Sequence, residues 1–356
     1  MEREDLFSAY RLFFDRTPVK EAVIEEKLRN FRSVPELIQA LAQSKEFNTP
    51  HCKRKLQANA VTEQLVVEAF RLILGRTPEN PEVIEGKVKN VKSQWHLVTA
   101  MIKSKEFLRK LDLRDFVSSE KFNSTPKTVY LHIPKTAGKA FEKLAEQNYG
   151  DGCSLSTTGN FSREHWESAQ LIGGHFFQSM YDSMHGQRIF LSVVRDPVDR
   201  AISRFNYYRD REAGYERRVE RKFDHQSLKN TIRDSGFRRE FIDNYQCLYL
   251  SGKHRYSSVR HAFSNDVFIV GSFDKIDQWL AFLSEKLSWQ DSTLPQINVA
   301  SDPGYMNEFK NDSELLDILV QNNEEDYKLV DFIRTEEVYC SAPPGFDFSP
   351  FKAQQN

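Results

Sequence analysis

The apolar positions of this chain follow one pattern in its first third and another beyond it. The early apolar residues recur at helical spacing, as Leu6, Tyr10 and Phe13 do. Later, short β-branched runs such as 128–133 and 189–194 stop at proline-containing turns, and helical patterns follow them. Strands that alternate with helices are typical of an α/β fold. The pattern therefore predicts an all-α region followed by an α/β domain with a mostly parallel sheet and flanking helices.

The all-α region repeats itself at an offset of 60 residues. Tyr10–Pro18 (YRLFFDRTP) matches Phe70–Pro78 (FRLILGRTP), and the SKEF of 44–47 returns at 104–107. Fixed-period similarity indicates two copies of one supersecondary unit. The pattern resembles the DUF4214 helical repeat of bacterial proteins, and this resemblance implies a module that binds protein or glycan.

Arg16 and Arg76 occupy equivalent positions in the two copies. Both follow a helical pattern and precede a Thr-Pro turn. Such arginines can bind a ligand, but they can equally form surface salt bridges with nearby carboxylates. We expect the second role, in which each arginine stabilises its own turn.

Changes in composition mark the limits of the domains. The stretch 116–127 is mostly polar and contains Pro126, as a linker would. We predict a helical tandem repeat over 1–115, a linker over 116–127, an α/β domain over 128–345 and a tail over 346–356.

The α/β region opens with a strand, a short loop and a helix, within the sequence TVYLHIPKTAGKAFEKLAEQNYG (128–150). The N–H groups at the start of a helix have no partner inside the helix, and the helix dipole attracts negative charge there. Lys135 adds a full positive charge to the loop. The arrangement predicts a site for a phosphate or sulfate ester, formed by Lys135, Thr136, Ala137, Gly138, Lys139 and Ala140.

This loop differs from the phosphate loop of common NTPases, which reads G-x-x-x-x-G-K-[ST]. Ala140 stands where that loop has the hydroxyl residue that binds Mg²⁺, and the first glycine of the pattern is missing. The sequence therefore disfavours an NTPase or a kinase, and we keep a phosphate-loop kinase only as a remote alternative.

A second strand ends in a charged turn at the start of a helix. Arg195-Asp196-Pro197 follows the run 189–194, and proline suits the first turn of a helix. Ser203 lies eight positions after Arg195, about two helical turns further on. We expect Asp196 to brace an arginine or to cap this helix, and Arg200 to face solvent.

These two elements resemble the 5′-phosphosulfate loop (H-I-P-K-T-A-G) and the 3′-phosphate motif (R-[DE]-P-x-[DE]-R-x-x-S) of the carbohydrate sulfotransferases. The likeness is to the heparan 2-O- and chondroitin sulfotransferases and spans about 126–340. It implies a P-loop-like fold and 3′-phosphoadenosine-5′-phosphosulfate (PAPS) as co-substrate. It also implies that Arg195 and Ser203 bind the 3′-phosphate and that Asn298 lies near the cofactor. Arginine suits this role because its planar fork meets phosphate oxygens with two hydrogen bonds.

His175 lies between the two elements and follows Gly173-Gly174. A lone histidine is often only structural. In the family that the chain resembles, however, a G-H-F element supplies the base that removes a proton from the acceptor hydroxyl. An alcohol is a poor nucleophile at neutral pH, and a histidine can take its proton. The resemblance thus implies His175 and Lys135 as catalytic residues and a carbohydrate as acceptor.

The loop departs from the family pattern after T-A-G. The family usually has Thr or Ser there, whereas this chain has Lys139-Ala140. A hydroxyl donor to the 5′-phosphate is therefore absent. The alternative to an enzyme is a glycan-binding or scaffold protein in which the sulfotransferase fold is inert and the repeats carry the function.

Composition sets the remaining limits. The formal net charge is −1, which gives no general attraction to nucleic acid. The sequence shows neither a signal-peptide pattern nor an apolar run of transmembrane length. Its four cysteines are scattered, without the C-x-x-C spacing of a zinc site. We expect a cytoplasmic, bacterial protein that uses no metal, and the sequence does not predict its oligomeric state.

Overall fold

The computed structural model describes the chain except for residues 1–2, 19, 32–33, 76–77, 79–80, 157–161, 206–231, 234–237, 239–241, 296–308 and 354–356. The chain forms two compact units. Unit 1 is built on Met1–Asp115, and unit 2 is built on Phe116–Asp234 and Phe241–Asn356.

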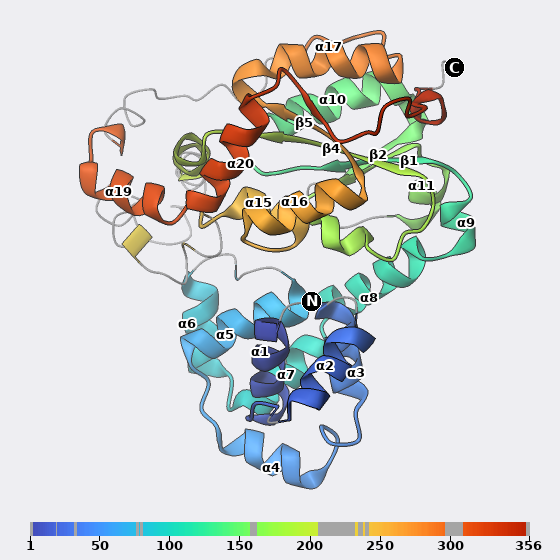
Figure 1. Ribbon diagram of the computed structural model, residues 1–356. Helices are drawn as coiled ribbons and strands as arrows, with labels where there is room; N and C mark the ends of the chain where they lie inside the picture. The colour runs from blue at the N-terminus through green and yellow to red at the C-terminus, as the bar shows by residue number, and fades with distance from the viewer. Residues whose placement is uncertain are drawn as a thin grey trace, which may run out of the picture. The chain divides into compact units, whose positions relative to one another are not determined.

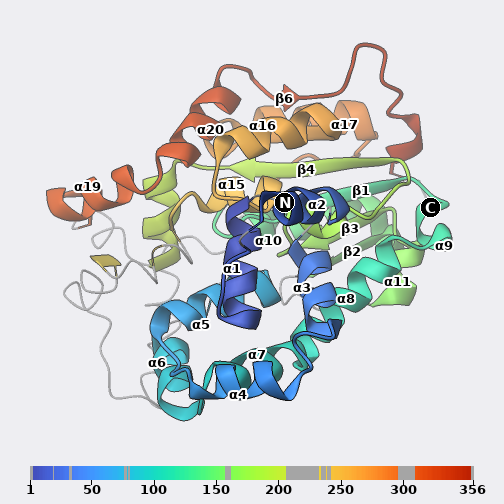
Figure 2. The same ribbon diagram turned by 60° about the horizontal axis from the view of Figure 1, so that its bottom comes forward.

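The described part of unit 1 is helical. Its helices are α1 (Arg3–Phe14), α2 (Glu21–Asn30), α3 (Val34–Gln43), α4 (Pro50–Ala58), α5 (Glu63–Ala69), α6 (Pro81–Asn90), α7 (Gln94–Ile102) and α8 (Lys105–Val117), and the π-helical turn η1 (Phe70–Leu74) continues α5. Helices α1, α2 and α3 begin 60 residues before α5, α6 and α7, which is the offset of the sequence repeat. Helix α1 packs against α2, α3, α5 and α7 and contributes much of the core of this unit (Figure 2).

Arg16 stabilises the turn after α1. Its guanidinium donates to both carboxylate oxygens of Glu46, at 2.8 and 2.9 Å. It also lies over the rings of Tyr10 and Phe14. The expected structural role is therefore confirmed for Arg16, whereas Arg76 lies outside the described residues.

Unit 2 is built on one mostly parallel sheet, which confirms the predicted α/β class. Its strands are β1 (Lys127–Leu131), β2 (Cys153–Ser156), β3 (Leu171–Gly174), β4 (Arg188–Val194), β5 (Val267–Ser272) and β6 (Tyr339–Cys340). They lie in the order β2-β3-β1-β4-β5-β6, and β6 alone runs antiparallel to its neighbour among these strands. Strands β1, β3 and β4 are almost entirely buried, as their continuous apolar runs predict.

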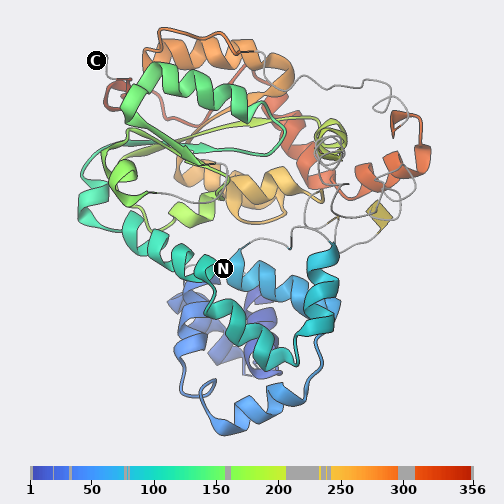
Figure 3. The ribbon, with the colours of Figure 1, turned by 180° about the vertical axis from the view of Figure 1, so that it is seen from behind.

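Helices cover both faces of this sheet (Figures 1 and 3). Helices α10 (Gly138–Tyr149) and α17 (Ile276–Leu287) lie on one face, and α15 (Tyr245–Ser251) and α16 (Tyr256–Asn265) lie on the other. Phe141 and Leu144 of α10 join Trp279 of α17 in the core above the sheet. Further described helical segments include α9 (Glu120–Asn123), α11 (Arg163–Ser168), α19 (Ser313–Gln321), α20 (Glu324–Arg334), residues 197–205, and the short 3₁₀ turns η2 (Gly150–Gly152), η3 (Gln178–Tyr181), η4 (Phe273–Lys275) and η5 (Ser349–Phe351).

The segments that we predicted as linker and tail pack onto unit 2. Helix α9 lies within 116–127, and the ring of Phe122 is fully buried, 4.8 Å from that of Phe116. In the stretch 346–356, Phe351 belongs to the core and Ala353 N–H donates to the Leu287 carbonyl at 2.9 Å. A polar composition concealed both attachments, because one buried aromatic ring suffices to dock a short polar segment.

Candidate functional site

The three predicted functional elements follow three neighbouring strands. Strands β3, β1 and β4 are adjacent and parallel, with Leu131 opposite Gly174. The carboxyl ends of parallel strands meet at one edge of a sheet. The loop after β1 therefore emerges between His175, which follows β3, and Arg195, which follows β4. The chain places β3 on one side of β1 and β4 on the other, and ligands of open α/β sheets bind at such a switch point.

The loop after β1 has an unusual backbone. Lys135 has φ 75° and Ala137 has φ 67°, both in the left-handed region that side chains disfavour. Each such residue costs about 1 kcal/mol or more, and this strain is concentrated at functional sites. Thr136 is buried and its hydroxyl donates to the Ile133 carbonyl at 2.8 Å. This bond holds the turn that presents the first N–H groups of α10 to the sheet edge.

Residue 138, the first of α10, has room only for glycine because the His132 ring occupies the space of its side chain. A Cβ at this position would lie 1.6 Å from His132 Nε2. The φ angle of Gly138 does not lie in the left-handed region, so the requirement for glycine comes from the close approach of the imidazole. The His132 ring therefore packs directly against the backbone at the end of the loop.

We expect Gly138→Ala to lower the free energy of unfolding by about 2 kcal/mol, because the added methyl group must displace a buried ring. The measurement is urea unfolding followed by tryptophan fluorescence. Gly152→Ala is the control, since a Cβ there meets only Tyr149 Cβ at 3.9 Å, and we expect a change within about 0.5 kcal/mol. The cost of Gly138→Ala should largely vanish in a His132→Ala background. An undiminished cost would show that the ring is not the cause.

Arg195 is held by hydrogen bonds to its backbone and by an aromatic ring that packs against its side chain. The side-chain amide of Gln246 accepts from Arg195 N–H and donates to the Arg195 carbonyl, both at 2.8 Å. The guanidinium lies 4.4 Å from the centroid of the Phe273 ring. Its Nη1 donates to the Lys135 carbonyl at 3.2 Å, which joins the two predicted anion-binding elements.

The guanidinium of Arg195 has hydrogen-bonding capacity to spare. Its Nε is buried and has no hydrogen-bond partner within the part of the chain that the structure describes. Burial lowers the pKa of Arg195, and the carboxylates of Asp199 and Asp196 act in the opposite direction. A buried cation with an unused donor is costly unless an anion satisfies it. The residue therefore has the properties expected of an anion ligand.

The helix at residues 197–205 carries two of the other motif residues. Asp196 caps it by accepting from Asp199 N–H at 2.9 Å, as we expected of this aspartate. Ser203 is partly exposed on the same helix. Arg200, which we expected to face solvent, is fully buried; it donates to the Ile242 carbonyl at 3.3 Å and lies over the Tyr245 ring. Its role is therefore to anchor this helix inside unit 2.

His175 is partly exposed at the carboxyl end of β3. Gly174 precedes it with φ 130°, and a Cβ there would lie 1.8 Å from the Ser156 carbonyl oxygen. His175 N–H donates to that carbonyl at 3.0 Å. The ring meets the His132 ring edge to face, with centroids 4.4 Å apart. The two glycines before His175 thus let the chain pass close to its neighbours and set the position of the imidazole.

The surroundings of His175 keep its ring neutral. Burial, together with the neighbouring His132, Arg204 and Lys139, lowers the pKa of His175 to about 2. The imidazole is therefore unprotonated at physiological pH and has a lone pair to offer, but burial and nearby positive charge make it a weak base. An anion bound beside Lys139 and Arg204 would oppose that charge and raise the pKa of His175.

The structure brings together most, but not all, of the predicted site residues. The 135–140 loop, Arg195 and His175 share one sheet edge, and Lys139 is exposed there whereas Ala140 is buried. Asn298 lies outside the described residues. Sequence reasoning missed Gln246 and Glu142. For Gln246 the signal was a polar residue inside the apolar helix YQCLYL, and for Glu142 the sequence offers no clear signal.

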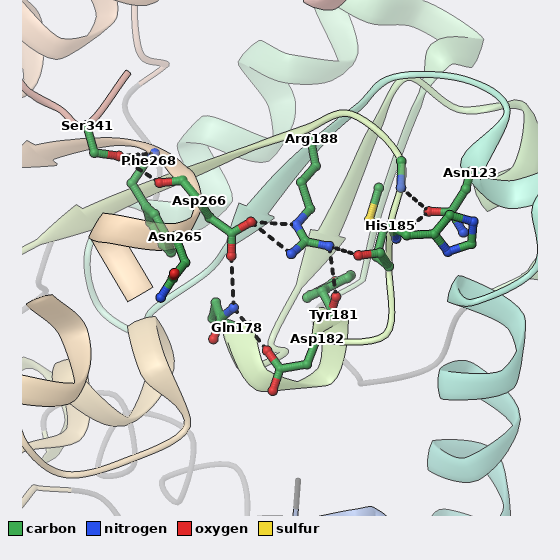
Figure 4. Close-up of polar contacts among 12 residues, drawn as sticks. Asn123, Gln178, Tyr181, Asp182, His185, Arg188, Asn265, Asp266, Phe268 and Ser341 are labelled. Carbon is green, nitrogen blue, oxygen red and sulfur yellow. Dashed lines mark hydrogen bonds and ion pairs between the residues drawn. The ribbon is translucent and has the colours of Figure 1, made fainter. Parts of the chain in front are cut away.

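A polar cluster occupies the opposite, amino-terminal edge of the sheet (Figure 4). Arg188 at the start of β4 binds Asp266 through Nε at 2.9 Å and Nη2 at 2.8 Å, and it also donates to the Met184 carbonyl. Gln178 donates to Asp266 and Asp182 at 3.4 and 3.1 Å. The cluster lies beside a hollow of about 540 Å³. These side chains satisfy one another and tie the start of β4 to the start of β5.

No protein-family model matches this chain, and no curated protein does. Two further observations concern the described residues alone. They contain no group of three or more His, Cys, Asp or Glu side chains placed to hold a metal ion. None of their helices has the length and apolar character needed to cross a membrane.

Proposed function

We propose that this chain transfers a sulfuryl group from PAPS to a hydroxyl group of a carbohydrate. The observation that carries the proposal is the meeting of the Lys135 loop, Arg195 and His175 at one edge of the sheet, with Arg195 Nη1 bonded to the Lys135 carbonyl. An anion loop, a second anion ligand and a base candidate are the parts that this transfer needs. The sulfotransferase resemblance of both motifs supports the same assignment.

Each residue then has one task. Lys135 and the N–H groups at the start of α10 stabilise negative charge on the phosphate oxygen from which the sulfuryl group departs. Arg195 and Ser203 hold the 3′-phosphate, and the spare Nε of Arg195 suits that anion. His175 takes the proton of the acceptor hydroxyl. Fixing both phosphates on a rigid sheet edge sets the in-line geometry of the transfer.

Binding of the cofactor would also raise the pKa of His175 and so strengthen it as a base. Positive charge on Lys139 and Arg204 contributes to the low pKa of the free imidazole. Binding of a multiply charged anion offsets this charge, so His175 becomes a stronger base when the cofactor is in place. The carbohydrate acceptor follows from the family resemblance, and in this proposal the repeats of unit 1 bind a glycan or a protein partner.

Binding of adenosine 3′,5′-bisphosphate to the full chain tests the cofactor. Calorimetry compares this nucleotide with AMP, which lacks the 3′-phosphate, and with ATP and Mg²⁺. We expect Arg195→Ala to weaken the bisphosphate about 100-fold, equivalent to about 2.7 kcal/mol for a charge-assisted fork, and AMP far less. Lys143→Ala removes a positive charge from an exposed position of α10 and should change neither affinity.

Two results would contradict the proposal. A preference for ATP with Mg²⁺ would favour the kinase alternative, and no nucleotide binding would favour the glycan-binding scaffold. Equal losses for the bisphosphate and AMP in Arg195→Ala would show that Arg195 does not read the 3′-phosphate. Because Gln246 bonds to the backbone of Arg195, the substitution removes the guanidinium and leaves the turn held.

A further inference from the structure

His132 touches both halves of the candidate site. Its backbone N–H donates to the Gly174 carbonyl at 2.8 Å, which fixes the residue before His175. Its imidazole is 5% exposed and lies where a side chain of residue 138 would stand, beneath the first turn of α10. The same ring meets His175 edge to face at 4.4 Å. One buried side chain therefore lies between the base candidate and the anion-binding loop.

Glu142 sets the orientation of His132. Its Oε1 lies 3.1 Å from His132 Nδ1, and the Tyr130 ring stacks against the imidazole at 5.6 Å. A carboxylate bonded to one ring nitrogen decides which nitrogen carries the hydrogen. The other nitrogen, Nε2, faces Gly138 at the amino end of α10, where helix N–H groups favour a lone pair. The arrangement fits an ionised Glu142 that accepts a hydrogen bond from Nδ1–H.

Burial and the nearby charges shift the pKa values of both His132 and Glu142. Burial, together with the cations Arg204, Lys139 and Lys135, lowers the pKa of His132 to about 3, so the ring stays neutral. Burial raises the pKa of Glu142 to about 7, and Lys139 opposes this effect. When Glu142 is ionised, its negative charge lies one imidazole away from His175 and opposes the charges of Lys139 and Arg204. It therefore favours positive charge on His175.

We propose that His132 and Glu142 form a positioning pair, in which His132 holds the His175 ring against the loop and the Glu142 carboxylate orients His132 and balances the charge that His175 gains. The inference rests on the proposed function, because that function makes His175 the base. The acceptor proton moves to His175 as the new S–O bond forms and the S–O bond to the nucleotide phosphate breaks. Neither His132 nor Glu142 exchanges a proton in this step.

Nitrogen-15 NMR of the histidine side chains in the full chain tests the pair. The spectra report the tautomers of His132 and His175 in the free chain, and the pKa of His175 with adenosine 3′,5′-bisphosphate bound. Glu142→Gln keeps an acceptor for Nδ1–H and removes the charge. We expect it to preserve the His132 tautomer and to lower the pKa of His175 in the complex by about 1.

A second variant and a control complete the test. His132→Phe keeps a ring in place without the nitrogen atoms, and we expect it to change the tautomer population of His175. Glu146→Gln removes a charge from an exposed position of the same helix and should leave all these signals unchanged. We expect Glu142→Gln to bind the bisphosphate within about twofold of the parent chain, because Glu142 lies behind His132 rather than in the loop.

The NMR signals and the binding of the bisphosphate distinguish an error in the pairing from an error in the proposed function. If the pKa of His175 stays the same in Glu142→Gln and its tautomer stays the same in His132→Phe, the pairing is overturned while nucleotide binding stands. If the parent chain does not bind the bisphosphate, the proposed function fails. The tautomers of the free chain then decide the pairing, since a changed His175 tautomer in His132→Phe supports it and an unchanged one overturns it.

Discussion

Replacing Asp326 with alanine is expected to lower the free energy of unfolding of unit 2 by about 4 kcal/mol. The Asp326 carboxylate is fully buried at the start of α15, where it accepts from Gln246 N–H at 2.9 Å and Cys247 N–H at 2.8 Å. The buried guanidinium of Arg200 acts on it as a counter-charge. The substitution leaves two buried N–H groups and a buried cation without compensation, which is one of the costliest changes in a protein interior.

The effect should also reach the candidate site. Asn244 accepts from the backbone N–H groups of Glu325 and Asp326 at 2.9 and 3.1 Å, so the starts of α15 and α20 cap each other. Gln246, within the first turn of α15, bonds to the Arg195 backbone on both sides. Loosening of α15 therefore displaces Arg195, and we expect Asp326→Ala to weaken binding of adenosine 3′,5′-bisphosphate as well.

Urea unfolding followed by tryptophan fluorescence measures the loss. The signal reports mainly on unit 2, because Trp166, Trp279 and Trp289 lie there. The matched control is Asp312→Ala, since Asp312 is a partly exposed cap that accepts from Leu315 N–H at 3.3 Å at the start of α19. We expect this variant to lose about 1 kcal/mol. Similar losses in the two variants would show that the buried charge of Arg200 plays no part.

Local patterns in the sequence account for the elements of the fold that were predicted correctly. The apolar runs that become β1 and β4 are continuous because both faces of these strands are buried. The loop at 135–138 and the turn at Arg195 were recognisable because their residues are neighbours in sequence. Parallel pairing then brings the two together without any further information from the side chains.

The parts that sequence reasoning missed depend on distant partners. Gln246 lies 51 residues from Arg195, and Asp326 lies 80 residues from Gln246. Arg200 was expected in solvent because charge favours water, but a buried tyrosine ring, a carbonyl and a buried carboxylate of other elements offset that cost. Gly138 reads as an ordinary loop glycine until the His132 ring is seen in the place of its side chain.

The largest effect on turnover is expected for His175→Ala. In the proposed reaction this variant loses the group that takes the acceptor proton, and such a loss lowers the rate about 10²- to 10⁴-fold. His175 is not part of the anion loop, so we expect the affinity for adenosine 3′,5′-bisphosphate to stay within about twofold. The separation of rate from affinity is what distinguishes a base from a residue that only supports the site.

The assay follows transfer of labelled sulfate from PAPS to desulfated heparan and chondroitin polymers. His165→Ala is the control, because His165 is exposed on α11 and away from the three strand ends. Imidazole added to the buffer should restore part of the rate of His175→Ala, since the alanine leaves room for it beside His132. A full rate in His175→Ala would exclude this residue as the base, and the base would then have to be sought among other side chains at the same sheet edge.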